Sequence, residues 1–279
     1  MAENPDPIDW IGKSQSQTGE IDAKQTELLA ITLDCPIPDK GARLPPCWHW
    51  AWFNEAKRKG ELGRDGHPKR GGFMPPIVLP RRMWAGGSFE FFNPLIVGST
   101  VTKTSTIKDI VEKEGRSGKL CILTIQHDWM ENENLCIREE QKLVYREDPE
   151  PDAPALEPPE PPQNPELTRE IMPDPVTMFR YSALTFNGHR IHYDADYARN
   201  VEGYPDIVFH APLTATHLCN LAQTLAKGKP LKQFSYRATS PLFANETFTV
   251  NGKHTGDNEL TLWATTPQGK QAMQASVKL

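Results

Sequence analysis

A proline-rich segment divides the chain into two parts and constrains its fold more than any other feature. Residues 148–175 read D-P-E-P-D-A-P-A-L-E-P-P-E-P-P-Q-N-P-E-L-T-R-E-I-M-P-D-P. Proline removes a backbone donor and restricts the residue before it, so this segment is expected to be extended and not a helix or central strand. The sequence therefore predicts an N-terminal domain over 1–147, a linker over 148–175 and a C-terminal domain over 176–279.

The two parts repeat a pattern of expected strands. A triplet with aromatic first and third residues, F-E-F at 89–91 or F-S-Y at 234–236, is followed in each part by Pro-Leu and then by an alternating segment. Period-two alternation indicates half-buried strands. Further strands are expected at 101–111, 120–125, 143–146, 248–254, 260–264 and 275–279. The repeat favours two related antiparallel meanders, and a chance likeness is the alternative.

One helix is clear in the second part. Residues 212–226 place Leu218, Leu221 and Leu225 on one apolar stripe, Pro212 suits the first turn, and glycine and proline follow the segment. A long helix followed by four strands is typical of a helix wrapped in an antiparallel sheet. The first part is expected to have shorter helices over 21–33 and 48–59, and a turn-rich loop over 63–76.

Charge and hydropathy exclude several classes of protein. The net charge is −5, but six acidic residues lie in or beside the linker, so the remainder is close to neutral. A nucleic-acid binder would need a basic stripe, and no apolar run reaches the roughly 20 residues of a membrane span. The acidic, polar N-terminal sequence does not resemble a secretory signal, so a cytoplasmic protein is expected.

The five cysteines are odd in number, widely spaced and without a C-x-x-C pair. This pattern argues against a disulfide framework and against a thiolate metal site. Small buried side chains are the expected role of these residues.

Several motifs together resemble the MaoC-like, or R-specific enoyl-CoA hydratase, family. They are F-R-Y-S-A-L-T-F-N-G-H-R-I-H-Y-D (179–194), V-E-G-Y-P (201–205), H-A-P-L (210–213), L-P-R-R-M-W-A-G-G (79–87) and G-R-S-G-K-L (115–120). In the family's D-x-N-P-x-H motif an aspartate and a histidine lie five residues apart, and here Asn187 and His192 hold those positions. The form with asparagine resembles the branch of 3-hydroxyacyl-thioester dehydratase type 2 and of itaconyl-CoA or mesaconyl-C4-CoA hydratases.

The resemblance implies an α+β double hot dog, two helix-wrapped antiparallel sheets in one chain. The first would be a degenerate, substrate-binding hot dog and the second the catalytic one. The implied activity is that of a lyase, hydrating or dehydrating an acyl-CoA, with no cofactor beyond the coenzyme A of the substrate.

Hydration of an activated double bond needs a base for the water, an acid for the α-carbon and donors on the thioester oxygen. Histidine suits proton transfer near neutral pH, whereas asparagine can only donate and accept hydrogen bonds. His192 is therefore the expected base and acid, and Asn187 the group that positions water. The family's H-G-x-L pattern implies that the backbone N–H of Ala211, at a helix start, binds the thioester oxygen.

Each of these residues also has a structural interpretation. His192 could be a hydrogen-bonded interior histidine. For His189 and His210, a structural role and an active-site role are equally compatible with the sequence. No metal site is expected, because Gly188 breaks any helix that would place His189 and His192 on one face. The tryptophans of W-H-W-A-W (48–52) are expected in the core and not in an acyl pocket.

Basic side chains are candidates for the coenzyme A phosphates or a substrate carboxylate. The expected substrate-binding residues are His189, Arg190, His210, Arg81 and Arg82. Arginine presents a planar fork that fits a carboxylate. Lys69 and Arg70 are expected to be solvated surface.

The leading hypothesis is hydration of itaconyl-CoA or mesaconyl-C4-CoA to citramalyl-CoA, as in itaconate degradation. Dehydration of a 3-hydroxyacyl-thioester on coenzyme A or acyl carrier protein is the alternative. A hot dog thioesterase and a non-catalytic acyl-thioester-binding module remain as other classes. Either a monomer or a homodimer is expected, since two hot dogs in one chain already form a pseudo-dimer.

Overall fold

The computed structural model describes residues 5–115, 118–148 and 157–279. The N-terminal half contributes five of the strands seen in these ranges: β1 (Ser14–Glu20), β2 (Arg81–Phe91), β3 (Thr100–Gly115), β4 (Gly118–Glu131) and β5 (Asn134–Arg146). The C-terminal half contributes β6 (Leu167–Ile171), β7 (Gln233–Ala238), β8 (Phe248–Gly256), β9 (Glu259–Thr265) and β10 (Gln271–Lys278). The strands expected from period-two alternation are thus confirmed, most of them longer than predicted.

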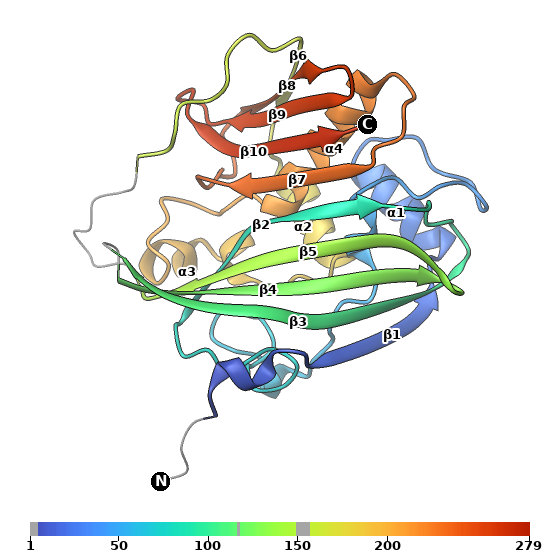
Figure 1. The fold of residues 1–279 in the computed structure, drawn as a ribbon. Helices are drawn as coiled ribbons and strands as arrows, with labels where there is room; N and C mark the ends of the chain where they lie inside the picture. The colour runs from blue at the N-terminus through green and yellow to red at the C-terminus, as the bar shows by residue number, and fades with distance from the viewer. Residues whose placement is uncertain (1–4, 116–117, 149–156) are drawn as a thin grey trace.

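All of these strands form one antiparallel sheet in the order β1-β3-β4-β5-β2-β7-β10-β9-β8-β6 (Figure 1). The order of the second half mirrors that of the first. The halves join where β2 pairs with β7, and Phe89 is opposite Phe234 at this junction. Their rings are nearly parallel, with centroids 6.0 Å apart. The two aromatic triplets that suggested a repeat therefore meet at the centre of the sheet.

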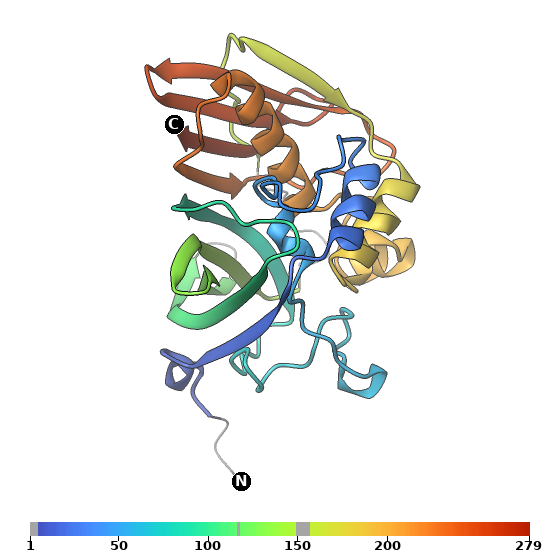
Figure 2. The same cartoon turned by 90° about the vertical axis from the view of Figure 1, so that its right-hand side faces the viewer.

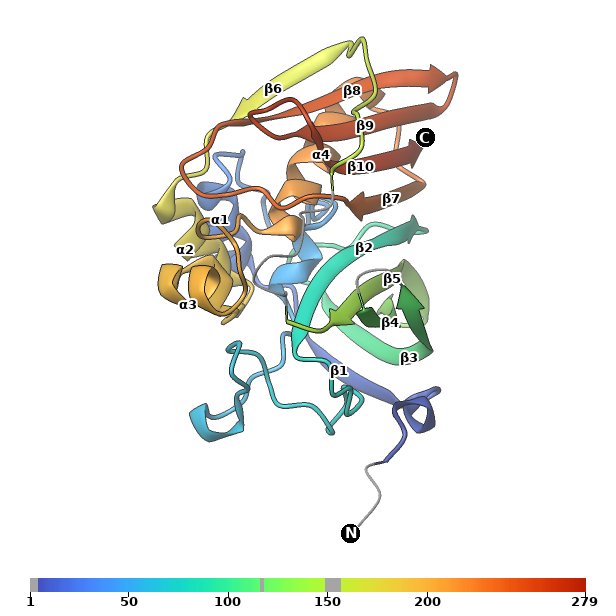
Figure 3. The ribbon, with the colours of Figure 1, turned by 90° about the vertical axis from the view of Figure 1, so that its left-hand side faces the viewer.

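The helices α1 (Ala23–Thr32), α2 (Pro175–Leu184), α3 (Ala195–Asn200) and α4 (Ala211–Ala226) lie on the same side of the sheet (Figures 2 and 3). The α4 helix packs against β7 to β10, and its buried face enters a core that spans both halves. A smaller core fills the curved N-terminal part of the sheet. No helix in the described ranges is long and apolar enough to cross a membrane.

The prediction of a helix over 48–59 is wrong. Only Trp48–Ala51 forms a short 3₁₀ turn, and Phe53 has a left-handed backbone with φ of 55°. Trp48 and Trp52 are buried in the main core, as expected. Burial of these bulky rings outweighs the weak helix propensity of the segment. The N-terminal half therefore has a short turn before β2 where the C-terminal half has α4 before β7.

Part of the predicted linker is a strand. Leu167–Ile171 form β6, which pairs with β8 at the edge of the sheet. The eight-residue sequence N-P-E-L-T-R-E-I has a single proline, Pro165, and none within the strand, so the N–H groups needed for the ladder are present. Residues 149–156 of the predicted linker lie outside the described ranges.

Candidate active site

The segment after α2 forms a tight turn that presents His192. Phe186 adopts a left-handed backbone with φ of 48°, and the N–H of Asn187 donates to the carbonyl of Ser182 at 2.8 Å. The side-chain Oδ1 of Asn187 then accepts the backbone N–H of His189 at 3.0 Å. A 3₁₀ turn over Arg190–His192 completes the segment. Asn187 therefore closes the turn that carries the histidines.

His192 is held as a neutral imidazole with one free nitrogen. Its Nδ1 is 2.8 Å from the carbonyl oxygen of Val208, so Nδ1 carries the proton and donates it. The other nitrogen, Nε2, is left with a lone pair. Burial lowers the pKa of His192 to about 4, against the weaker opposing effect of the Val208 hydrogen bond. At neutral pH His192 has the protonation state that a general base requires.

The ring of His192 stacks on that of His210, with centroids 3.8 Å apart. His210 is fully buried, precedes the first residue of α4, and its Nε2 lies 2.7 Å from Ser182 Oγ. Burial lowers the pKa of His210 well below its ordinary value, so this ring is also neutral. The stack places the candidate base directly beside the start of α4.

The first turn of α4 offers a backbone donor. The N–H of Ala211 makes no hydrogen bond within the described part of the chain. The first N–H groups of a helix have no intrahelical partner, and the helix dipole places partial positive charge there. Ala211 can therefore donate to an oxygen on which negative charge develops, as its place in the motif implied.

A loop from the N-terminal half docks on this segment. The N–H of Arg190 donates to the carbonyl of Asp65 at 2.9 Å, and Arg190 Nη1 donates to the carbonyl of Arg64 at 3.1 Å. Gly66 has a left-handed φ of 89°, and a Cβ added there would overlap the carbonyl oxygen of Gly188. The two halves therefore meet backbone to backbone beside the candidate catalytic histidines.

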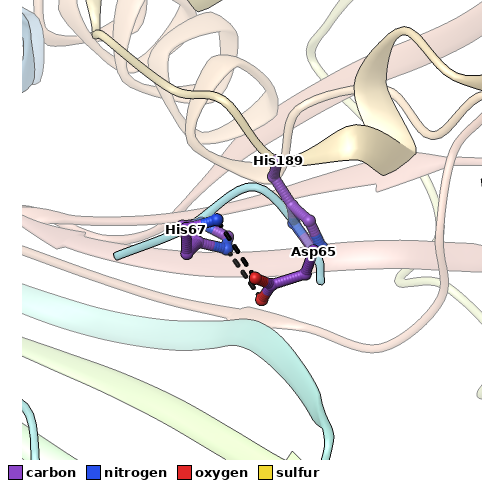
Figure 4. A group of neighbouring side chains, drawn as sticks. All are labelled: Asp65, His67 and His189. Carbon is purple, nitrogen blue, oxygen red and sulfur yellow. Dashed lines mark hydrogen bonds and ion pairs between the residues drawn. The ribbon is translucent and has the colours of Figure 1, made fainter. Parts of the chain in front are cut away.

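This loop brings a carboxylate and a further histidine to the site. The Oδ2 of Asp65 accepts the Nδ1–H of His67 at 3.0 Å, and Oδ1 accepts the backbone N–H of His67 at the same distance. The ring of His67 contacts that of His189, with centroids 4.5 Å apart (Figure 4). His189 in turn lies edge to face against His192, with centroids 5.5 Å apart.

Electrostatics within the group favour a charged carboxylate and a neutral His189. Burial raises the pKa of Asp65, but the hydrogen bonds and charge of His67 outweigh this and lower it below its ordinary value. Burial, with the nearby charge of Arg82, lowers the pKa of His67, and the hydrogen bond and charge of Asp65 oppose this shift. Burial also lowers the pKa of His189, whose Nε2 is buried without a partner among the described residues.

Asp65, His67 and His189 also form a donor set that a divalent cation can use, with one ligand atom of each within 4.8 Å of the others. Two features argue against that use. Both oxygens of Asp65 already accept N–H groups of His67, and Arg82 brings a positive charge close to His67 and His189. A site without metal stays the prediction.

Two predicted substrate-binding arginines are engaged within the protein. Arg190 donates twice to Asp194 and stacks on the ring of Tyr197. Arg81 is buried in an ion pair with Glu202, at 2.8 Å. Both guanidinium groups fix the segments that surround the motif.

Arg82 differs from its neighbours. It lines a cavity of about 250 Å³ together with Arg64, Lys69, Arg70, Asp65, His67 and Tyr145. Arg64 is paired with Asp148, Lys69 donates to the carbonyl of Gly60, and Arg70 donates to the carbonyls of three residues from 77 to 80. The side chain of Arg82 makes no hydrogen bond or ion pair within the described ranges. It is the uncommitted cation of this cavity.

The residue-based predictions did not include Asp65 or His67. The pair stands in the turn-rich loop as D-G-H, two residues apart, with no periodic pattern around it. Only the docking of this loop on the distant segment at 188–190 brings the pair to the site. A carboxylate and a histidine in a loop with several glycines were the one signal available.

Comparisons with known proteins agree with this architecture. The profile of the family described as hydroxyacyl-thioester dehydratase type 2 matches residues 47–244. Mesaconyl-C(4)-CoA hydratase of Chloroflexus aurantiacus is 43% identical over 273 residues, which cover 97% of this chain and 96% of the relative.

Two solved structures share the fold. The MaoC-like dehydratase from Phytophthora capsici aligns with a TM-score of 0.71 at 15% identity over 97% of both chains. A Mycobacterium tuberculosis protein described as a double hot dog aligns with a TM-score of 0.56 at 12% identity, over 99% of this chain and 98% of that one. The chain belongs to the hydroxyacyl-thioester dehydratase type 2 family and folds as a double hot dog.

Proposed function

We propose that the protein is a hydratase that adds water across the double bond of a short-chain enoyl-CoA. One observation carries the proposal: a neutral His192 with a free Nε2 stacks beside the start of α4, where the N–H of Ala211 is unpaired in the described structure. A base and an oxyanion donor are thus adjacent, which is what conjugate addition of water to a thioester needs.

The reaction follows from these groups. His192 Nε2 takes a proton from water while the water oxygen bonds to the β-carbon. The electrons of the double bond move toward the thioester, where the N–H of Ala211 and the α4 dipole stabilise the oxygen. Asn187 uses Oδ1 on His189, which leaves its Nδ2 to position the water. Protonation of the α-carbon completes the addition.

We propose a carboxylated acyl group, itaconyl or mesaconyl-C4, with citramalyl-CoA as product and itaconate degradation as the process. Support comes from Arg82, an uncommitted guanidinium in the cavity beside His67 and His189. The name of the Chloroflexus relative adds to this support. An arginine fork binds a carboxylate through charge-assisted hydrogen bonds.

Dehydration of a 3-hydroxyacyl-thioester is the second candidate, because the family description names that activity. Both candidates use the same chemistry in opposite directions, so they differ in the acyl group. A preference for long, uncharged chains would favour the dehydratase of fatty-acid metabolism.

A panel of thioesters tests the proposal. Mesaconyl-C4-CoA, itaconyl-CoA, 3-methylcrotonyl-CoA, crotonyl-CoA and a long-chain enoyl-CoA would be compared by product formation and product stereochemistry. For the conjugated esters, which exclude itaconyl-CoA, loss of the conjugated absorbance would be followed as well. The 3-methylcrotonyl ester replaces the carboxylate of mesaconyl-C4-CoA with a methyl group. We expect turnover of the carboxylated esters above the uncharged ones. No turnover of any ester would favour a non-catalytic acyl-thioester-binding module, and release of free thiol would indicate a thioesterase.

The proposal includes a cytoplasmic enzyme that works as a monomer or homodimer and needs no cofactor beyond the coenzyme A of its substrate. These points rest on the sequence expectations. Cell fractionation and light scattering of the purified protein would test the first two.

A further inference from the structure

The site described so far has only His192 to move both protons of the hydration. His192 begins the hydration step neutral, and Asn187 stands where the family motif has an acid. His210 is buried against Ser182, and the unpartnered Nε2 of His189 is buried as well. A group that gives a proton to the α-carbon while His192 takes one from water has to come from elsewhere in the chain.

The Asp65–His67 pair of the N-terminal loop has the geometry for this role. A carboxylate that accepts the Nδ1–H of a histidine fixes its tautomer and stabilises its protonated form. Asp65 does both for His67, and it also accepts the backbone N–H of the same residue. His192, by contrast, has only the neutral carbonyl of Val208 behind it. Of the two rings, His67 is better supported to carry a proton.

The pair is held at the site by rigid contacts. Gly66, between the two residues, lies against Gly188 of the catalytic segment, and the carbonyl of Asp65 accepts the N–H of Arg190. His189 contacts the ring of His67 on one side and that of His192 on the other. The two candidate proton-transfer rings therefore flank one buried histidine.

The second nitrogen of His67 is available to a ligand. His67 lines the cavity of about 250 Å³ that also contains Arg82. Its Nε2 makes no hydrogen bond to the described residues and is not among their buried unpaired atoms. A carboxylated acyl group bound by Arg82 in this cavity would lie beside His67 Nε2.

We propose that His67, oriented by Asp65, is a second proton-transfer residue of the hydratase site, supplied by the N-terminal half; this rests on the proposed function. His192 Nε2 takes a proton as the water O–H bond breaks and the oxygen bonds to the β-carbon. The electron pair of the double bond moves to the α-carbon, which takes the proton of His67 Nε2. The proton on His192 then returns to His67 through solvent, and both rings regain their starting forms.

The charged and titratable groups around His67 determine its pH dependence. They are Asp65, which favours the protonated ring, Arg70 of the same loop, and Arg82, Tyr145, His189 and His192, which lie on other elements. Hydration needs protonated His67, so its rate falls as pH rises through the pKa of this ring. Replacing Asp65 by asparagine removes the favourable charge and moves that fall to lower pH.

The test compares His67→Ala and Asp65→Asn with Arg64→Gln, a control that changes a cation of the same cavity wall. Hydration of mesaconyl-C4-CoA is measured from pH 5 to 8, with and without imidazole, and urea unfolding confirms that each variant folds. We expect His67→Ala to lose about 10²-fold in kcat and to regain part of it with imidazole, since the cavity admits a small base. In Asp65→Asn the fall in rate at high pH should begin at lower pH. Arg64→Gln should show neither the loss in kcat nor this shift of the pH–rate profile.

Two results would overturn the inference while leaving the proposed function intact. One is wild-type kcat in folded His67→Ala. The other is a loss of kcat in His67→Ala that imidazole does not restore, together with a pH–rate profile of Asp65→Asn that matches wild type at high pH. This combination would show that the role of the pair is purely structural. A wild-type protein that hydrates no ester would instead overturn the proposed function itself.

Discussion

Gly66 and Gly188 lie against each other where the two halves of the chain meet at the active site. The carbonyl oxygen of Gly188 occupies the space that a Cβ on Gly66 would fill, and Gly66 has a left-handed φ of 89°. No other residue type fits this contact without displacing the loop. The contact fixes Asp65 and His67 relative to the histidines of the C-terminal half.

Gly66→Ala should therefore impair catalysis more than folding. The added methyl group pushes the loop away from Gly188, and a displacement of about 1 Å at a catalytic group can cost about 10²-fold in rate. Gly71→Ala is the matched control, because Gly71 also has a left-handed φ but its Cβ would meet nothing within 4 Å. The left-handed backbone alone should cost each variant about 1–2 kcal/mol in urea unfolding, and the clash with Gly188 adds to this cost in Gly66→Ala. Equal kcat/KM values in the two variants would contradict this role of the contact.

Arg82→Gln should weaken the enzyme selectively toward carboxylated substrates. Loss of a charge-assisted pair costs about 1.5–3 kcal/mol, which is about 10- to 150-fold in kcat/KM for mesaconyl-C4-CoA. The value for 3-methylcrotonyl-CoA should change little. Arg64→Gln, which removes a guanidinium already paired with Asp148, serves as the control. An equal loss of kcat/KM for both esters would show that Arg82 does not bind the carboxylate.

Ala211→Pro removes the proposed oxyanion donor while keeping the helix start. Proline is tolerated at the first helical position, and His210 already has the extended backbone (φ −65°, ψ 120°) that precedes proline. The expected loss in kcat is about 10²–10³-fold. Ala211→Gly retains the N–H and should stay near wild type. Equal kcat values for the two variants would show that the N–H of Ala211 is not the oxyanion donor.

Acid should destabilise the fold through its buried neutral histidines. Burial lowers the pKa of both His127 and His192 to about 4, below the ordinary value of 6.5. Their contribution to stability is complete above pH 6.5 and is lost as pH falls toward 4. At pH 5 each such ring should cost about 2 kcal/mol of unfolding free energy relative to pH 7. Urea titrations should show this slope, and His127→Gln should make it shallower; a flat profile would refute the burial argument.

The local elements of the fold could be predicted because their signals are local. The stripe of Leu218, Leu221 and Leu225 with a proline start predicted α4, and alternation predicted the strands. The segment over 48–59 could not be predicted correctly, because burial of Trp48 and Trp52 depends on distant partners. The pairing of Phe89 with Phe234 was likewise visible only as a repeat.

The residues of the site likewise fall into those that a local motif predicts and those that depend on tertiary packing. The motif singled out His192 and Ala211, and their geometry suits the roles that the sequence suggested. Arg81 and Arg190 were grouped with Arg82, yet both form ion pairs within the protein. Arg190 pairs with Asp194, four residues along the chain, whereas the partner of Arg81, Glu202, is distant in sequence and depends on tertiary packing. Asp65 and His67 reach the site through a contact more than 100 residues away in sequence. Residues brought in by docking of the halves need a structure to be seen.

The central claim is that His192 moves the proton in hydration of a short carboxylated enoyl-CoA. The most direct measurement follows the conjugated absorbance of mesaconyl-C4-CoA with wild-type protein and with His192→Gln, at equal concentrations of folded protein. We expect steady loss of absorbance with wild type and a rate about 10²–10⁴-fold lower with the variant. Equal rates for the two proteins would contradict the assignment of His192, and an unchanged absorbance with wild type would contradict the proposed activity.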